Sequence, residues 1–155
     1  MTSVVVERIN RPGDLDGVIA IEEASFVNPT TREWYQNELQ RPEVCFIYVI
    51  RTFDTPVAGF CAFWRVADQV HINNLAILPA LRGHGLGLRL LTATIEATAQ
   101  MGATSATLEV RQSNTAARRL YAKAEFHEAG VRRNYYTHPV EDALVLLWRR
   151  AGSSA

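Results

Sequence analysis

Residues 74–87 have the sequence NLAILPALRGHGLG and join a strand pattern to a helical pattern. The strand pattern covers residues 70–77 and ends before Pro79, and the helical pattern runs from Gly85 to Gln100. The first amides of a helix have no intrahelical partner and lie at the positive end of the helix dipole. Glycines let a phosphate approach such amides closely, and Arg82 adds a positive charge. The loop 82–87 therefore predicts a pyrophosphate site.

Taken alone, this glycine loop is a signal of moderate specificity. A glycine-rich turn that only closes a strand-to-helix junction is the plain alternative. A nucleotide P-loop would need Gly-Lys-Ser/Thr after the loop, whereas Leu88 and Arg89 follow Gly87. A dinucleotide fingerprint would have its third glycine one position later, at Leu88. The loop supports neither of these nucleotide motifs.

The segments on either side alternate between strand and helix patterns. We expect one domain over residues 1–150, a frayed tail at 151–155, and a mixed sheet flanked by helices in the α/β class. Asp14 or Asp16 is expected to cap the first helix, which would bury Val18, Ile19, Ile21 and Phe26. The expected order is β-α-α-β-β-β-α-β-α-β-β: a strand at 4–9, two helices (the second at about 31–40), a hairpin at 46–50 and 57–64, a strand at 70–77, a helix at 85–100, a strand at 104–110, a helix capped by Ser113 or Asn114, and paired strands at 129–136 and 143–148.

The composition is that of a soluble globular protein, with 155 residues, 48% hydrophobic and 21% charged. No window approaches the roughly 18–20 apolar residues of a membrane span, and the N-terminus lacks a signal-peptide pattern. We therefore expect a cytoplasmic protein without membrane association. Cys45 and Cys61 lie inside apolar runs and favour a reducing compartment. The four histidines are scattered, so we expect no metal.

Charge is unevenly distributed although the 16 basic and 16 acidic residues cancel. Residues 12–45 hold seven acidic and two basic residues, whereas residues 82–133 hold eight basic and four acidic residues. Two solvated faces would explain this pattern. The functional interpretation is an anionic ligand at one end and a cationic ligand at the other. The overall neutrality argues against nucleic-acid binding by bulk charge.

Three motifs resemble a known family. The arginine–glycine loop with the preceding residues 74–79 resembles the acetyl-coenzyme A signature of the GNAT N-acetyltransferase superfamily. LEVRQSNTAA at 108–117 and VRRNYY at 131–136 resemble, more narrowly, the RimI-type ribosomal-protein alanine N-acetyltransferases. The resemblance covers residues 4–148.

Two segments depart from the pattern of this family. Ala124-Glu125-Phe126 stands where the family usually has Leu-Gly-Phe, which could alter a helix end. Asn28-Pro29-Thr30 stands where members often carry Pro-Trp near the acceptor, which affects the expected peptide preference.

The resemblance implies transfer of acetyl from acetyl-CoA to a protein α-amine, most narrowly to the N-terminal alanine of small-subunit ribosomal protein eighteen. It implies that the backbone of Leu75, Ala76 and Ile77 pairs with the pantetheine arm, with the Ile77 N–H near the thioester oxygen. Asn114 would contact the coenzyme in addition to its default role as a helix cap. The amides expected to hold the pyrophosphate are those of Arg82, Gly83, His84, Gly85, Leu86, Gly87 and Leu88.

Direct transfer needs a neutral amine, yet an α-amino group with a pKa of about 7.7–8.0 is mostly protonated at neutral pH. Glu109, in an otherwise apolar strand, is the candidate general base, and a structural pair with Arg111 is the alternative. Tyr121 is the candidate general acid for the leaving thiolate, and a core tyrosine is the alternative. Neither His84, inside the pyrophosphate loop, nor His71, well before the coenzyme-facing segment, is assigned as the base.

Two rival functions stay open. A GNAT enzyme could instead act on a small-molecule amine or on a lysine side chain, whose pKa of about 10.4 demands stronger deprotonation. A non-enzymatic acetyl-CoA-binding module is disfavoured by the joint presence of Glu109 and Tyr121. If the acidic segment 12–45 flanks the acceptor, the acceptor peptide should carry basic residues shortly after its first residue.

Overall fold

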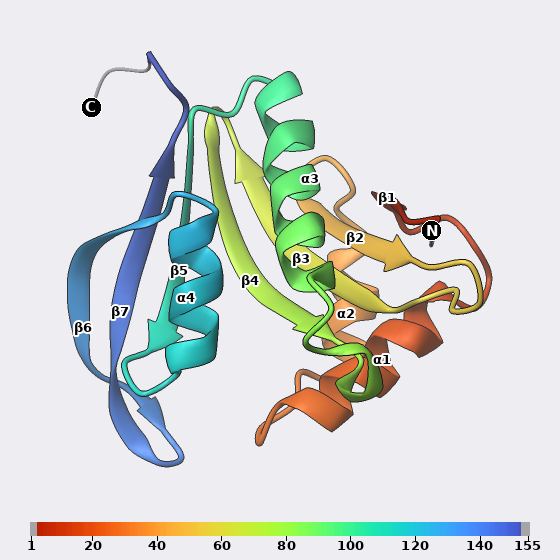
Figure 1. Cartoon of the computed structure of the whole chain (residues 1–155), viewed down its shortest axis with the longest axis horizontal. Coiled ribbons are helices and arrows are strands. Elements are labelled where there is room, and N and C mark those ends of the chain that lie inside the picture. The colour runs from red at the N-terminus through yellow and green to blue at the C-terminus, as the bar shows by residue number, and fades with distance from the viewer. Residues whose placement is uncertain (1–2, 153–155) are drawn as a thin grey trace.

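A seven-stranded mixed sheet forms the centre of the computed structural model, which describes residues 3–152 (Figure 1). The strand order is β1-β2-β3-β4-β5-β7-β6, and β4 and β5 are the parallel pair. The predicted α/β order is confirmed, with one added 3-10 turn, η1. The elements are β1 (Val5–Arg8), α1 (Asp14–Ser25), α2 (Arg32–Glu38), β2 (Cys45–Arg51), β3 (Gly59–Val66), β4 (Gln69–Ile77), η1 (Pro79–Leu81), α3 (Leu86–Gln100), β5 (Ser105–Arg111), α4 (Thr115–Lys123), β6 (His127–Thr137) and β7 (Val140–Arg149).

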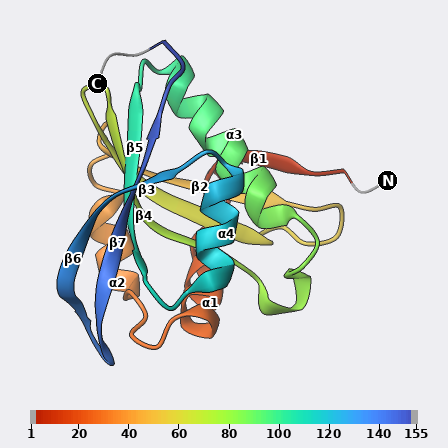
Figure 2. The same ribbon diagram turned by 60° about the vertical axis from the view of Figure 1, so that its left-hand side comes forward.

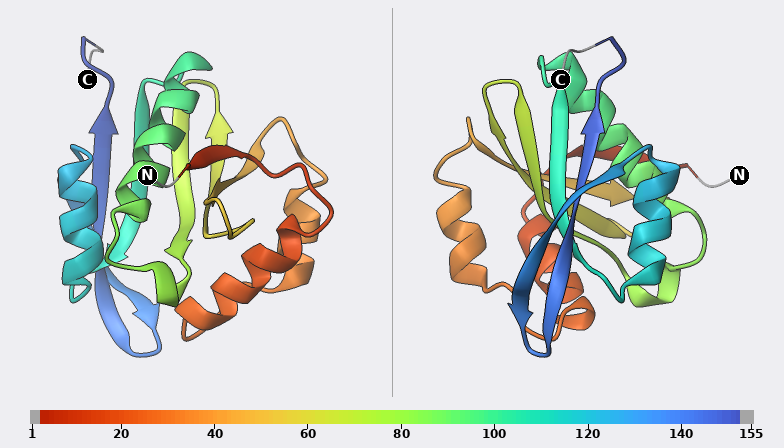
Figure 3. Two further views of the ribbon diagram at one scale, coloured as in Figure 1. Left: turned by 45° about the vertical axis from the view of Figure 1, so that its right-hand side comes forward. Right: turned by 90° about the vertical axis from the view of Figure 1, so that its left-hand side faces the viewer.

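Helices cover the two faces of the sheet in pairs, with α1 and α2 on one face and α3 and α4 on the other (Figure 3). Successive side chains of β3 point alternately to the two helical layers. Phe60 and Ala62 pack with α1 and α2, while Cys61 and Phe63 pack with α3. Each layer therefore has its own buried apolar cluster.

Strands β4 and β5 separate along their length (Figures 1 and 2). Their parallel pairing covers Gln69–His71 on β4 and Ser105–Thr107 on β5. Beyond His71, β4 pairs with β3 on its other side. The last part of β4 consequently has one open edge, as expected for a strand whose neighbour diverges.

A β-bulge in β4 reverses which face its side chains point to. Ala62 lies opposite Asn74 and Phe63 opposite Ile72, so Asn73 is the extra residue. Before the bulge Ile72 packs in the α3 layer, and after it Ala76 packs in the α1 layer. His71 and Asn74 thus lie on the same face although they are three positions apart, an odd spacing that would put them on opposite faces of a regular strand.

Helix α1 differs from expectation at both ends. Its N-cap is Gly13, and neither predicted residue, Asp14 or Asp16, caps it. The Asp14 carboxylate instead accepts hydrogen bonds from the N–H groups of Asn10 and Arg11, each at 2.9 Å. Phe26, predicted to face inward, is 37% exposed, because the helix ends at Ser25 and helical spacing no longer applies to the extended residue after it. The predicted burial of Val18, Ile19 and Ile21 is confirmed.

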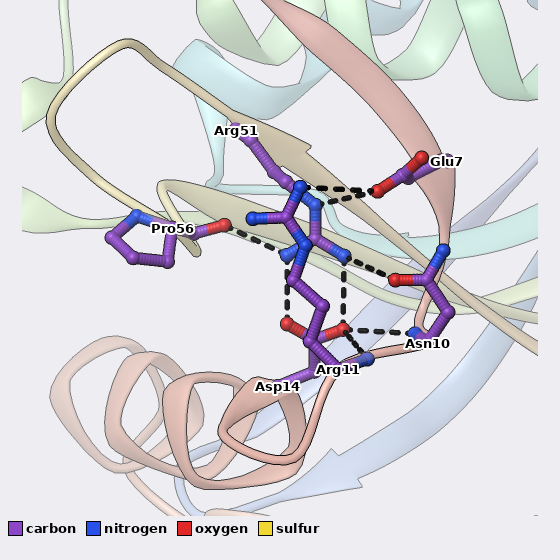
Figure 4. A network of polar contacts seen from close by, with 6 residues as sticks. All are labelled: Glu7, Asn10, Arg11, Asp14, Arg51 and Pro56. Atoms are coloured by element: carbon purple, nitrogen blue, oxygen red, sulfur yellow. Dashed lines mark hydrogen bonds and ion pairs between the residues drawn. The ribbon is translucent and has the colours of Figure 1, made fainter.

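Asp14 belongs to a buried network centred on Arg51 (Figure 4). The Arg51 guanidinium donates to both carboxylate oxygens of Asp14, at 2.7 and 2.9 Å, and to Glu7 at 2.8 Å. This guanidinium holds the pKa of the Asp14 carboxyl well below its usual range. The network joins β1, β2 and the start of α1.

Three further observations concern the cysteines, membrane-spanning helices and metal-holding groups. Cys45 and Cys61 are free and buried, and burial raises the pKa of the Cys61 thiol to about 12. Across residues 3–152, no helix has the length and apolar character needed to cross a membrane. The same residues contain no group of three His, Cys, Asp or Glu side chains that could hold a metal ion.

Candidate active site

The first cavity, here called the glycine-loop cleft, opens where β4 leaves β5 and has a volume of about 620 Å³. Its walls come from the open end of β4, the loop before α3, the first turn of α3, and α4. All the predicted coenzyme-binding residues except His84 line it, and so does Tyr121. These residues are Leu75, Ala76, Ile77, Arg82, Gly83, Gly85, Leu86, Gly87, Leu88 and Asn114.

The glycine loop has the backbone conformation that glycine favours. Gly83 and Gly85 have φ angles of 83° and 81°, in the left-handed region. Gly85 is the N-cap of α3, so the amides of the first turn border this cleft. This arrangement suits a phosphate or another anion.

Arg119 and Lys123 of α4 add positive charge to the same cleft. They lie four residues apart, which places them on one side of the helix. Both belong to the basic segment 82–133, and neither was predicted to be a site residue. A basic pair at i and i+4 was the signal that could have identified them.

Two side chains of the loop interact within the protein. The Arg82 guanidinium donates to the Ile77 carbonyl at 3.0 Å and to the Ser25 hydroxyl at 2.9 Å, which ties the loop to the end of α1. His84 Nδ1 lies 3.1 Å from the Leu81 carbonyl oxygen, away from the cleft lining.

Asn114 and Tyr121 position the α4 side of the glycine-loop cleft. Asn114 Oδ1 accepts the Ala117 N–H at 3.1 Å, so Asn114, one of the two predicted caps, begins α4. Tyr121 is 8% exposed and packs edge-on against Phe126. Its hydroxyl has no hydrogen-bond partner among residues 3–152, and burial raises the pKa of this phenol above its ordinary value. Tyr121 is therefore both a core residue and part of the cleft wall.

The second cavity, here called the Glu109 cleft, lies on the α1 and α2 side of the sheet and measures about 470 Å³. Trp34 of α2 and two tyrosines of β6, Tyr135 and Tyr136, contribute to its lining. Asn134, at φ 50°, lies within a register shift of β6 between Arg132 and Tyr136, the stretch that also holds the two tyrosines of the lining. The residues lining this cleft are Pro29, Thr30, Thr31, Trp34, His71, Ile72, Asn73, Asn74, Glu109, Tyr135 and Tyr136.

Glu109 contacts His71 and not Arg111. Its Oε1 lies 2.8 Å from His71 Nε2, and its Oε2 lies 3.8 Å from Arg132 Nε. The Glu109 side chain is 9% exposed. Arg111 pairs with Glu141 at 3.3 Å instead, which removes the structural alternative proposed for Glu109.

His71 was not assigned a role from sequence, yet it lies against the candidate base. A carboxylate oxygen accepts hydrogen bonds, and the facing ring nitrogen of His71 donates in the tautomer that carries a hydrogen on Nε2. His71 Nδ1 lies 3.0 Å from the Asn73 side-chain oxygen. The pairing of His71 with Thr107 across the parallel strands brings these side chains together, and that register leaves no local signal in the sequence.

Consecutive segments of β4 line the two clefts. Leu75, Ala76 and Ile77 line the glycine-loop cleft, and residues 71–74 of the same strand line the Glu109 cleft. A buried carboxylate on one side and a protonated phenol on the other flank one strand. Such a pair can accept a proton from a nucleophile and donate one to a leaving group.

Residues 15–126 match the Acetyltransferase (GNAT) family. A protein of Bacillus subtilis (strain 168) is 38% identical over 146 residues, 94% of this chain and 96% of its own length; it carries a provisional form of the name ribosomal protein bS18-alanine N-acetyltransferase. The Escherichia coli (strain K12) protein that has this name is 32% identical over 136 residues, 86% of this chain and 89% of that protein. The crystal structure of the ribosomal-protein-S18-alanine N-acetyltransferase from Escherichia coli superposes with a TM-score of 0.86 at 28% identity, covering 99% of both chains.

Proposed function

Because the chain belongs to the acetyltransferase (GNAT) family, we propose that it transfers the acetyl group of acetyl-CoA to the N-terminal alanine of ribosomal protein bS18. The observation that carries this proposal is that consecutive segments of β4 line two different clefts, in a chain that matches relatives of that name over nearly its whole length. A ribosomal acceptor agrees with the cytoplasmic location that the sequence predicts.

The glycine-loop cleft fits the coenzyme in shape and chemistry. Its left-handed glycines and the first amides of α3 suit a pyrophosphate, and Arg119 and Lys123 supply cations. The open edge of β4 at residues 75–77 could pair with the amides of the pantetheine arm. When bound, acetyl-CoA supplies an activated thioester.

The Glu109 cleft supplies the base in this proposal. The amine of the acceptor enters between Trp34 and the β6–β7 hairpin and loses a proton to Glu109. His71 orients the carboxylate through its Nε2–H. As the new N–C bond forms, the Ile77 N–H stabilises the developing oxyanion.

Tyr121 supplies the acid. The C–S bond breaks as the phenol gives its proton to the sulfur, and the products are the acetylated amine and CoA with a free thiol. Burial raises the pKa of Tyr121, which keeps the phenol protonated before the reaction and makes it a weak acid, so the proton moves to the sulfur only as negative charge develops there.

The test uses the whole protein, acetyl-CoA and two peptides. One has the N-terminal sequence of bS18 from the same organism, including its lysines, and the other has the same sequence with a blocked N-terminus. We expect CoA release with the first peptide, and fragment masses that locate one acetyl group on the α-amine. Acetylation of lysine in the blocked peptide, or coenzyme binding without transfer to any amine, would contradict the proposal.

A further inference from the structure

Helix α1 contains a second buried carboxylate, Glu22, at the end nearest the Glu109 cleft. Glu22 is 1% exposed, and the catalytic scheme above does not use it. A buried carboxylate is costly unless hydrogen bonds compensate its lost hydration, so its partners indicate its role.

Three donors from three parts of the fold converge on Glu22. Its Oε1 accepts the Tyr35 hydroxyl at 2.6 Å and the Asn74 side-chain N–H at 2.7 Å. Its Oε2 accepts the backbone N–H of Thr30 at 2.9 Å. Tyr35 belongs to α2, Asn74 follows the bulge of β4, and Thr30 lies in the segment between α1 and α2.

Two of these partners, Thr30 and Asn74, line the Glu109 cleft themselves. The third, Tyr35, is fully buried and packs edge-on against Trp34, another lining residue. Thr31, which follows Thr30, caps α2 by accepting the Trp34 N–H at 3.1 Å. Glu22 thus holds lining residues of the Glu109 cleft, although it does not line the cleft itself.

The three donors around Glu22 require a hydrogen-bond acceptor at its position. The Thr30 N–H and the Asn74 amide N–H can only donate. The Tyr35 hydroxyl accepts from Asn74 at 3.1 Å and therefore directs its own hydrogen to Glu22. Burial and the Glu22 carboxylate both raise the pKa of Tyr35, which keeps that hydrogen in place. A glutamine of the same shape would present an NH₂ group to at least one of these donors.

We propose that Glu22 is a positioning residue. It fixes one wall of the Glu109 cleft, the cleft that receives the acceptor amine, by holding Thr30 and Asn74 in place. This inference rests on the proposed function in that the cleft receives the acceptor amine. Glu22 does not touch the reacting atoms, so its loss should weaken acceptor binding and alignment while the glycine-loop cleft stays intact.

The same helix provides a matched control. Asp14 is also buried, at 2% exposure, and is also held by several donors, but its network lies at the opposite end of α1 and touches neither cleft (Figure 4). Glu22→Gln and Asp14→Asn each replace one buried carboxylate by its amide. Both variants should lose stability, so they are compared at a temperature where circular dichroism shows each to be folded.

For Glu22→Gln we expect the KM for the acceptor peptide to rise by roughly tenfold or more, with the Kd for acetyl-CoA within about twofold of the wild type. Asp14→Asn should leave both constants unchanged. Tyr35→Phe removes one donor to Glu22 and one of the acceptors of Asn74 but leaves the Glu22 carboxylate and the buried ring in place, so it should fold even if Glu22→Gln does not, and it should raise the same KM by a smaller factor.

A second measurement does not depend on the acceptor. The hydrogen-exchange rate of the Thr30 amide should rise in Glu22→Gln and stay unchanged in Asp14→Asn. An unchanged Thr30 exchange rate, or equal effects of the Glu22 and Asp14 variants on acceptor KM, would overturn the inference. If wild-type protein fails to acetylate the bS18 peptide while Thr30 exchange responds as expected, the proposed function fails and the positioning role of Glu22 stands.

Discussion

The glycine-loop cleft and the Glu109 cleft share β4 but are assembled in different ways. Most of the first comes from one continuous segment, residues 75–88, and offers backbone groups. The second needs contacts between distant residues, such as His71 with Glu109, 38 positions apart, and Glu22 with Asn74, 52 positions apart. Backbone recognition can thus be encoded locally, whereas a carboxylate-based site depends on how strands are paired.

The two clefts also differ in charge. Arg119, Lys123 and the positive end of α3 line the glycine-loop cleft, while the carboxylate of Glu109 lines the other cleft and that of Glu22 lies buried behind its wall. Variants in one cleft should therefore change the kinetics of one substrate and leave those of the other unchanged.

The largest expected effect is that of Glu109→Gln, which removes the base and preserves the shape of the side chain. We expect kcat/KM to fall by roughly 10²–10⁴-fold with unchanged binding of acetyl-CoA. Activity should recover in part above about pH 8, where the α-amine of the acceptor is neutral without help.

Glu141→Gln is the control for Glu109→Gln, because Glu141 pairs with Arg111 and lines neither cleft. Its kinetics should match those of the wild type. Near-normal turnover of Glu109→Gln at pH 7 would remove Glu109 from the mechanism.

Next in size is Tyr121→Phe, on the other side of β4. Since only the phenolic proton is lost, kcat should fall by roughly 10²-fold while the Kd for acetyl-CoA and the melting temperature change little. Tyr48→Phe, at a partly buried tyrosine outside both clefts, serves as the control. Normal turnover, or unfolding of the Tyr121 variant, would leave this residue with a structural role alone.

Gly85→Ala tests whether the glycine-loop cleft acts on the coenzyme alone. An L-residue at φ 81° costs about 1–2 kcal/mol, so the loop should distort and raise the KM for acetyl-CoA by roughly 5- to 30-fold. Gly130→Ala, at an open position without a positive φ, should have no effect. A similar rise in the acceptor KM would show that the clefts do not act independently.

A smaller effect concerns the charge of the acceptor. Of the seven acidic residues in segment 12–45, Asp14, Asp16 and Glu38 pair with arginines, and Glu22 is buried, so less free charge faces solvent than the sequence suggested. We still expect alanine-starting peptides with downstream Lys or Arg to have a higher kcat/KM, by about two- to fivefold, than acidic ones. Raising the salt concentration should shrink this ratio, because surface charges are screened over about 8–10 Å. Equal or better kinetics with acidic peptides would refute the preference.

The smallest effect lies outside both clefts, at Glu125. Its φ of 70° keeps the left-handed conformation of the glycine that the family usually has here, so α4 ends at Lys123 and the chain turns as a glycine would allow. Glu125→Gly should relieve this strain, but the greater conformational freedom of glycine in the unfolded chain offsets part of the gain. We expect the free energy of unfolding to rise by about 0.5–1 kcal/mol. Thermal unfolding should show a higher melting temperature with unchanged kinetics, and a lower melting temperature would contradict the strain argument.

Much of the molecule was already determined by local sequence. The order of strands and helices, the α2 cap at Thr31 and the left-handed Gly102 after α3 all follow from patterns within a few residues. The glycine loop also belongs to this group, because the conformation of Gly83 and Gly85 depends on their missing side chains and not on distant partners.

Only the tertiary structure decided which side chains lie together in the Glu109 cleft. The bulge at Asn73 turns His71 and Asn74 to one face, and the divergence of β4 from β5 after His71 opens both clefts. Neither event has a local signal, since register and bulges are set by the packing of whole strands against the two helical layers. For the same reason the partner of Glu109 is His71 and not the nearby Arg111: neighbours in the sheet are chosen by strand pairing, and sequence distance does not determine them.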